Sequence, residues 1–360
     1  MSSEFGGRLR VTIFGESHGA AIGVVVDNLP AGEPVDEAAV AAFLARRAGG
    51  KRTSTARKEP DVPELLSGLR GGRTTGAPLC AVIRNTDARS GDYGDLADLP
   101  RPSHADYPAW VKYGGANDIR GGGHFSGRLT APLCVAGAIC GQLLARRGVT
   151  VGAHVEAIAG VRDQRFDPVS VSAETLRAVA AKDFPVLDDA AGERMTARIL
   201  EAAAALDSVG GIVECAAVGL PPGVGAPLFG GVENRLAAAV FGIGAVRGVE
   251  FGDGFAAADM TGSTHNDPYR MVDGAVRAVT NHAGGVLGGL TSGMPLVFRA
   301  AFKPTASISR EQRTVSLSAR ENRTLSIRGR HDPCIVPRAV PCVEAAAAIT
   351  LLDLMLEEKE

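Results

Sequence analysis

The residues best suited to acid–base chemistry in this chain are its histidines, and most of them are expected in turns. Of the seven histidines, only His154 lies in an ordinary apolar stretch. The others lie in or beside segments rich in glycine, arginine or hydroxyl side chains: His18, His104, His124, His265, His282 and His331. Histidine is the side chain that most readily exchanges a proton near neutral pH. One such histidine is usually a surface residue, but several together favour a catalytic site.

Basic side chains form a second group, in a loop that follows the first expected helix. The group consists of Arg46, Arg47, Lys51, Arg52, Arg57 and Lys58. Arginine binds carboxylate and phosphate oxygens through two parallel hydrogen bonds. The loop is therefore either an anion clamp or a solvated basic surface. Because no GxxxxGK[ST] pattern occurs, an ordinary nucleotide-triphosphate loop is excluded.

Two further segments combine histidine with arginine. Residues 118–128 (DIRGGGHFSGR) lead directly into an apolar helix, and the start of a helix attracts anions through its N–H groups and dipole. In the segment RPSHADY (101–107), proline restricts the residue before it and stiffens the loop. We therefore expect an anion site at Gly121–Arg128 and a fixed position for His104.

Glycine and hydroxyl groups also gather near the C-terminus. Residues 281–293 (NHAGGVLGGLTSG) carry two Gly-Gly pairs, which could let a flat ring lie against the backbone or could be tight turns. Lys303, Thr305 and Ser307 offer one cation and two hydroxyl groups to a phosphate.

The chemistry of two further short motifs is not decided by the sequence alone. His331 and Asp332 could be an acid–base pair or metal ligands, although no HExxH or comparable second set accompanies them. Ser17 precedes His18 in GESHG, but the GxSxG pattern of a nucleophile elbow is absent.

The composition allows a large core and shows no overall electrostatic bias. Of 360 residues, 45% are hydrophobic, and the formal net charge is −2, so nucleic-acid or membrane-surface binding is not favoured. There is no apolar signal core, and no run approaches the ~18 apolar residues of a membrane helix, which predicts a cytoplasmic protein. The six cysteines form no CxxC pair, so we expect reduced, buried thiols.

Hydrophobic periodicity predicts a mixture of strands and helices. Strands are expected on both sides of a turn at 16–19 and at 78–86, 149–161 and 210–223. Helices are expected from Asp36 to about Arg47, at 130–148 with Thr130 as N-cap, and at 190–206, 233–246 and 343–358. Residues 87–128 show no long periodic element, which is typical of a functional loop. No Pro/Ser-rich linker divides the chain, so we expect one domain over residues 1–360.

A weak internal repeat is also present. GVVVDNLPAG (23–32) and GIVECAAVGLPPG (211–223) each read as a strand, Leu-Pro-x-Gly and then a helix. Chance and two similar strand–helix units both remain open.

These motifs together resemble the chorismate synthase family. The shared segments are Gly15–Gly19, Arg101–Tyr107, Gly121–Arg128, Asn281–Gly293, Lys303–Ser307 and Arg330–Pro333, in the order found in that family. The most specific are GESHG followed by VVVDNLPAG, and RGRHDPCIVPRAVPCVEA. The resemblance runs from about residue 8 to about residue 356, nearly the whole chain.

The resemblance implies an α+β fold, the β-α-β sandwich of chorismate synthases, as one large domain that usually forms a homotetramer. It implies a lyase that converts 5-enolpyruvylshikimate 3-phosphate to chorismate and phosphate by trans-1,4-elimination, the last step of the shikimate pathway. Reduced FMN is required although nothing is oxidised overall. The substrate carries two carboxylates and a phosphate, which would explain why a nearly neutral chain gathers arginine in a few loops.

The resemblance also implies catalytic roles. His18 matches the histidine credited with protonating the reduced flavin, and His104 matches the second catalytic histidine. Asp332, with Ser126, matches the groups proposed to relay a proton from flavin N5. Ser17, in the same turn as His18, is a further catalytic candidate.

Binding positions follow in the same way. Substrate contacts are expected from Arg46, Arg52, Arg101 and Arg128. Flavin contacts are expected from His124, Phe125, Ser126, Gly244, Ala245, Gly288, Lys303, Pro304, Thr305, Ala306, Ser307 and Arg330. Ala306 stands where serine is usual and Gly244 where asparagine is common, which puts one side-chain contact in doubt at each position.

The source of reduced flavin is expected to be external. Arg46 and Arg52 match positions usually linked to NADP, but GxGxxG is missing, so we expect a monofunctional enzyme served by a separate flavin reductase. From the residues alone, two rivals remain: a metal-dependent phosphohydrolase and a non-catalytic anion-binding protein. The second would not need several histidines in separate glycine-rich loops.

Overall fold

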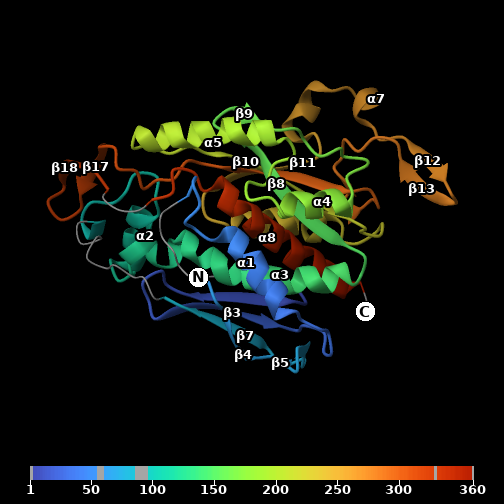
Figure 1. Cartoon of the computed structure of the whole chain (residues 1–360), viewed down its shortest axis with the longest axis horizontal. Coiled ribbons are helices and arrows are strands. Elements are labelled where there is room, and N and C mark those ends of the chain that lie inside the picture. The colour runs from blue at the N-terminus through green and yellow to red at the C-terminus, as the bar shows by residue number, and fades with distance from the viewer. Residues whose placement is uncertain (1–2, 55–60, 86–95, 328–330, 359–360) are drawn as a thin grey trace.

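The computed structural model describes residues 3–54, 61–85, 96–327 and 331–358, and within them two five-stranded antiparallel sheets enclose a layer of helices (Figure 1). The first sheet, in spatial order, contains β1 (Glu4–Phe5), β2 (Arg10–Gly15), β3 (Ala21–Asp27), β7 (Leu79–Arg84) and β4 (Glu64–Ser67). The second contains β11 (Val246–Phe251), β16 (Leu296–Phe302), β10 (Gly211–Val218), β8 (Thr150–Ile158) and β9 (Val161–Arg162).

The helix layer joins the two sheets. It contains α1 (Glu37–Arg47), α3 (Thr130–Ala145), α6 (Val232–Phe241) and α8 (Val336–Glu357). Helix α3 packs against β3 and β7, α8 packs against β8 and β10, and the two helices pack against each other. Helices α4 (Ala173–Ala180) and α5 (Asp189–Ala204) contact the second sheet through β8 and β9, with α5 on the outside in Figure 1. The expected α+β sandwich is therefore confirmed.

Smaller elements extend from this frame. They are α2 (Asp106–Tyr113), α7 (Gly262–His265), and the strand pairs β5–β6 (Leu69–Arg70, Arg73–Thr74), β12–β13 (Tyr269–Val272, Ala275–Ala278), β14–β15 (Val286–Leu287, Leu290–Thr291) and β17–β18 (Gln312–Ser316, Glu321–Leu325). Helix α2 lies inside the stretch where the sequence showed no long periodic element.

The two central helices approach closely because small residues face each other. A Cβ atom added at Gly137 of α3 would lie 2.2 Å from the Cβ of Ala345 on α8. Both helices are long and apolar enough to cross a membrane, contrary to the expectation from the sequence. However, 78% of the apolar window in Gly127–Ala145 and 94% of that in Val336–Glu357 is buried in the protein. Their hydrophobicity therefore serves the core.

The start of the last helix was wrongly predicted. Helix α8 begins at Val336 rather than at Val343, and it includes two prolines. Pro337 lies in the first turn, where a missing N–H costs nothing, and Pro341 follows one turn later. The helix therefore starts seven residues earlier than the sequence predicted.

Thr130 is also not the N-cap that the sequence suggested. It is the first residue of α3, and its hydroxyl donates to Gly127 O at 2.6 Å and accepts from Arg47 Nε at 2.8 Å. The capping hydroxyl lies one short turn earlier, where Ser126 Oγ accepts from Arg128 N at 3.3 Å. The N-cap of α1, by contrast, is Asp36 as expected.

The internal repeat corresponds to equivalent places in the two sheets. Strand β3 is central in the first sheet and leads to α1, while β10 is central in the second and leads to α6. Both helices pack against α8. This arrangement favours two similar strand–helix units over chance.

Candidate active site

A cavity of about 440 Å³ lies where loops from both halves of the sandwich meet the helix layer. Among the described residues that line it, six are cations: Arg47, Arg101, Arg128, Arg247, Lys303 and Arg338. Two are carboxylates, Asp61 and Asp332, and two are imidazoles, His104 and His331. The cavity is thus strongly positive in a chain whose formal net charge is −2, and it suits a small polyanion.

His104 is held by a buried carboxylate at the start of α2. Its Nδ1–H donates to Asp106 Oδ1 at 2.6 Å, while Arg101 donates to the same carboxylate from Nε at 2.7 Å and from Nη2 at 2.8 Å. Burial raises the pKa of Asp106, but the hydrogen bonds from Arg101 and His104 outweigh it and hold that pKa well below its usual range. Since Nδ1 donates, Nε2 is the nitrogen of a neutral His104 that can accept a proton.

Three successive glycines form a wall beside His104. Gly121, Gly122 and Gly123 have φ values of 61°, 87° and 53°, a region that favours glycine. A Cβ at Gly121 would lie 2.5 Å from Cδ2 of His18, and one at Gly122 would lie 3.4 Å from Nε2 of His104. The glycine backbone therefore passes between the two histidines, with His104 lining the cavity and His18 buried behind Gly121.

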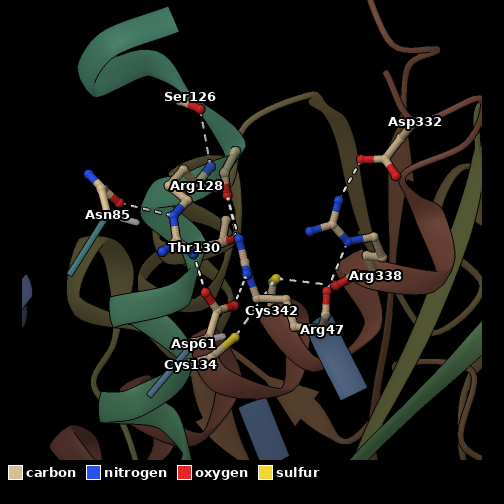
Figure 2. A network of polar contacts seen from close by, with 11 residues as sticks. Arg47, Asp61, Asn85, Ser126, Arg128, Thr130, Cys134, Asp332, Arg338 and Cys342 are labelled. Atoms are coloured by element: carbon tan, nitrogen blue, oxygen red, sulfur yellow. Dashed lines mark hydrogen bonds and ion pairs between the residues drawn. The ribbon is translucent and has the colours of Figure 1, made fainter. Parts of the chain in front are cut away.

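A second buried carboxylate joins two arginines of the cavity wall. Arg47, at the end of α1, and Arg128, before α3, both pair with Asp61 (Figure 2). The three side chains are only 4–5% exposed. Arg128 Nε also donates to Asn85 Oδ1 at 3.3 Å, and Arg47 Nη2 donates to Gly127 O at 3.3 Å. These contacts fix both guanidinium groups before any ligand arrives.

Asp332 faces the same cavity from the start of α8. Its Oδ2 accepts from Arg338 Nη1 at 2.5 Å, and Arg338 Nε donates to Arg47 O at 2.8 Å (Figure 2). Ser126, the N-cap of the short turn before α3, also lines the cavity. The candidate proton relay therefore lies in the same cavity as Arg101 and Arg128.

The segment after β16 supplies the remaining wall. Burial, with a smaller contribution from the charge of Arg247, lowers the pKa of Lys303. Ser307 Oγ accepts from Arg101 Nη1 at 3.1 Å. Thr305 Oγ1 is buried and has no hydrogen-bond partner among the described residues. A buried hydroxyl without a partner is costly, so this side chain is suited to a polar ligand atom.

Comparison with known proteins agrees with this geometry. The family model described as chorismate synthase matches residues 9–356. A chorismate synthase of Lancefieldella parvula is 45% identical, covering 99% of this chain and 96% of the relative. One of Aeropyrum pernix is 49% identical, covering 96% and 91%. A crystal structure of chorismate synthase superimposes with a TM-score of 0.77 at 27% identity, covering 98% of this chain and 93% of the other. The chain belongs to the chorismate synthase family.

The enzyme is therefore a lyase of the shikimate pathway. It converts 5-enolpyruvylshikimate 3-phosphate to chorismate and phosphate, a step of aromatic amino-acid biosynthesis. Members of the family need reduced flavin, although the elimination involves no net oxidation.

Most residues that the sequence singled out meet at the cavity of this family member. The lining includes His104, Asp332, Ser126, Arg101, Arg128, Phe125, Gly244, Ala245, Lys303, Thr305, Ala306 and Ser307. Ser17 does not line it, but its Oγ would lie 2.7 Å from a Cβ at Gly121, so it is buried behind the glycine wall with His18.

Two of the expected substrate arginines lie elsewhere. Arg46 forms a two-pronged ion pair with Glu344 of α8, at 2.5 and 2.7 Å. Together with the exposed Arg52 it lines a separate cavity of about 170 Å³, which shares Arg338 with the larger one. Arg47, the next residue, lines the larger cavity where Arg46 was expected.

Among the described residues, three expected flavin positions are not found on the cavity wall: His124, Gly288 and Pro304. His124 is held in place by both ring nitrogens: Nδ1–H donates to Gly15 O at 2.8 Å and Nε2 lies 2.8 Å from Ser3 Oγ. Gly288 lies in the β14–β15 turn, and Pro304 is exposed beside Lys303. Arg330 lies outside the described residues.

The sequence analysis missed several residues of the cavity wall. Arg47 and Arg338 were seen only as members of basic segments, whereas Asp61, Arg247 and Cys342 had no signal of their own. The role of an acidic residue whose only partners are arginines cannot be recognised from the sequence, because it depends on where those arginines lie in the folded chain.

Proposed function

We propose that the 440 Å³ cavity binds the phosphorylated substrate and reduced FMN side by side, and that His104, Asp332 and Ser126 move protons there. The observation that carries this proposal is the charge of the wall, where six cationic side chains face two carboxylates. A metal phosphohydrolase would instead need carboxylates and imidazoles to dominate such a site.

The substrate anions are assigned to the arginines of the wall. Arg47 and Arg128 are already oriented by Asp61, and Arg101 is oriented by Asp106. Preorganised guanidinium groups bind carboxylate and phosphate without the entropic cost of ordering long side chains. Arg338 lies next to them and links this group to Asp332.

Several residues of the chain fit a flavin phosphate and ring. Thr305 Oγ1 is buried and unpaired among the described residues, and Ser307 and Lys303 stand on the same segment. Phe125 and the flat surface of Gly121 can lie against a ring. When bound, reduced FMN supplies electron density to the breaking carbon–oxygen bond and recovers it afterwards.

His104 is assigned to the departing phosphate. Its Nε2 can carry a proton while Asp106 holds Nδ1–H, so the ring is oriented and its charge balanced in either state. Asp332, paired with Arg338, is assigned to the proton that leaves the substrate ring, with Ser126 as a partner. His18 and Ser17, behind the glycine wall, are assigned to protonation of the flavin.

The test is anaerobic incubation of the enzyme with 5-enolpyruvylshikimate 3-phosphate and photoreduced FMN. We expect chorismate absorbance and one phosphate per chorismate with reduced FMN, and none with oxidised FMN. Addition of a chelator should not change the rate. Turnover without reduced flavin, or phosphate release without chorismate, would remove the proposal.

We also propose a homotetramer in the cytoplasm that receives reduced flavin from a separate reductase. The β12–β13 hairpin projects from the frame (Figure 1) and exposes Tyr269, Met271 and Val276 to more than 60%, which supports self-association. All six cysteines are in the thiol form, as a reducing compartment allows. Light scattering should give four chains, and Met271→Asp should lower that number. NADPH with oxidised FMN should give no turnover unless a reductase is added.

A further inference from the structure

Two cysteines meet where the central helices cross beneath the cavity. Cys134 of α3 and Cys342 of α8 have their Sγ atoms 3.9 Å apart (Figure 2). All six cysteines of the chain are described, and no other two are recorded in contact. Cys342 lines the cavity, whereas Cys134 is fully buried behind it. Cys342 itself is only 3% exposed, so the pair has one cysteine at the cavity wall and a second directly behind it.

The surroundings favour a thiolate on the cysteine at the cavity wall. The hydrogen bond from Cys134 lowers the pKa of Cys342 despite burial, and Arg47, Thr130 and Arg338 act in the same direction. For Cys134, burial and the neighbouring sulfur raise the pKa well above its usual value. The first proton lost by the pair therefore leaves Cys342 as the thiolate, which is the reactive form of cysteine.

We propose that Cys342 and Cys134 are a modification site, which hydrogen peroxide converts to a reversible disulfide that lowers turnover. The Cys342 thiolate attacks one peroxide oxygen, the O–O bond breaks, and the released hydroxide takes up a proton to give sulfenic acid and water. The Cys134 sulfur then attacks the sulfenic sulfur and displaces a second water. Two thiols and one peroxide thus give one disulfide and two waters. If reduced flavin binds in this cavity as proposed above, its reaction with dioxygen would supply the peroxide there.

The disulfide acts on the site through the helices that carry the cysteines. The sulfur separation must fall from 3.9 Å to about 2.05 Å, so α3 and α8 are drawn together at this level. Thr130, at the start of α3, bonds Arg47, and Arg338, one turn before Cys342, bonds Asp332. Since a shift of about 1 Å at a catalytic group can cost 10²-fold, we expect turnover to fall by roughly tenfold or more.

Peptide mapping tests the bond without flavin or substrate, so its outcome is independent of the proposed function. The reduced full-length enzyme is treated with hydrogen peroxide, freed of peroxide, blocked with N-ethylmaleimide in denaturant and digested without reductant. We expect a peptide linking Cys134 to Cys342 as the first product, while Cys80 of β7 and the buried Cys140 still react as thiols. Oxidation of Cys80 first, or oxidation of Cys342 without the link, would overturn the proposal.

Turnover measurements test whether the disulfide inhibits the enzyme. Peroxide-treated enzyme, assayed anaerobically after removal of peroxide, should lose roughly tenfold or more in turnover and regain it with dithiothreitol. Cys134→Ser should give no link and no reversible loss, whereas the matched Cys80→Ser variant should respond as the wild type does. An oxidised enzyme that contains the link yet turns over normally would refute the inhibitory role, as would a reversible loss that persists in Cys134→Ser. The wild-type mapping stands even if a variant fails to fold.

Discussion

Asp106→Asn is the sharpest test of how His104 is controlled. The carboxylate accepts from the Nδ1–H of His104 at 2.6 Å and from Arg101 through N, Nε and Nη2 at 3.0, 2.7 and 2.8 Å. Its pKa, raised by burial, is held well below the usual range by the bonds from Arg101 and His104. A depressed carboxyl pKa contributes stability above the unfolded value of about 3.9, which is lost as the pH falls below it. Between pH 5 and 8 the group therefore stays ionised, and changes of activity there belong to other groups.

The substitution keeps the shape of the side chain but removes its charge. An amide that turns its NH₂ group to His104 makes Nδ1 an acceptor and removes the carboxylate that balances the charge of the ring when it carries both protons, which is the form that can donate from Nε2 to the departing phosphate. Since a positioned acid–base group contributes about 10²–10⁴-fold, we expect kcat to fall by roughly 10²-fold. Arg101 keeps its place on the cavity wall without its counter-charge, so KM should change by less than about threefold. Loss of a buried ion pair should also cost about 3 kcal/mol of unfolding free energy.

Anaerobic steady-state kinetics with reduced FMN separates kcat from KM, and urea unfolding measures the stability. Asp253→Asn is a matched control, because Asp253 pairs with His282 at 2.7 Å and neither residue lines the cavity, and it should leave kcat within about threefold. If Asp106→Asn instead raised KM and left kcat unchanged, Asp106 would only support Arg101, and the assigned control of His104 would be wrong.

Three further predictions separate residues that the sequence could not distinguish. Arg47→Ala should raise KM by about 10- to 100-fold, the loss of a charge-assisted contact of roughly 1.5–3 kcal/mol, whereas Arg52→Ala, which faces the smaller cavity, should raise it by less than about threefold; the reverse order in steady-state kinetics would restore the assignment made from the sequence. His104→Ala should lower kcat by roughly 10²–10⁴-fold. His124→Ala should chiefly lower the unfolding temperature, because both ring nitrogens of His124 already contact Gly15 and Ser3. Equal kcat values for the two variants would contradict this. Asp332→Ala should lower kcat and leave substrate binding nearly unchanged, and an effect on KM alone would exclude a proton-transfer role.

The elements were largely predictable, because strands and amphipathic helices leave a periodic pattern. The assignment of neighbouring arginines was not. Arg46 and Arg47 are successive residues at the end of α1, and successive side chains on a helix point about 100° apart. Which of them reaches the larger cavity depends on the position of Glu344 on α8, which pairs with Arg46. That position is set by the tertiary structure. The sequence therefore predicted a basic segment after α1, but which arginine of the segment lines the larger cavity can be read only from the folded chain.

The glycine run shows a different limit, because its geometry depends on residues that are distant in the sequence. Gly121–Gly123 were predicted as an anion site because they precede a helix. In the structure their positive φ values and missing side chains let a single layer of backbone separate His18 from His104. Even one methyl group at Gly121 would collide with His18 and Ser17 at 2.5–2.7 Å. Gly121 and Gly122 are thus required because the backbone passes close to two histidines. That proximity leaves no local pattern in the sequence. The same holds for Asp61, which pairs with Arg47 and Arg128 from two other segments. A sequence shows which groups can do the chemistry, whereas the groups that fix them become recognisable only once the chain is folded.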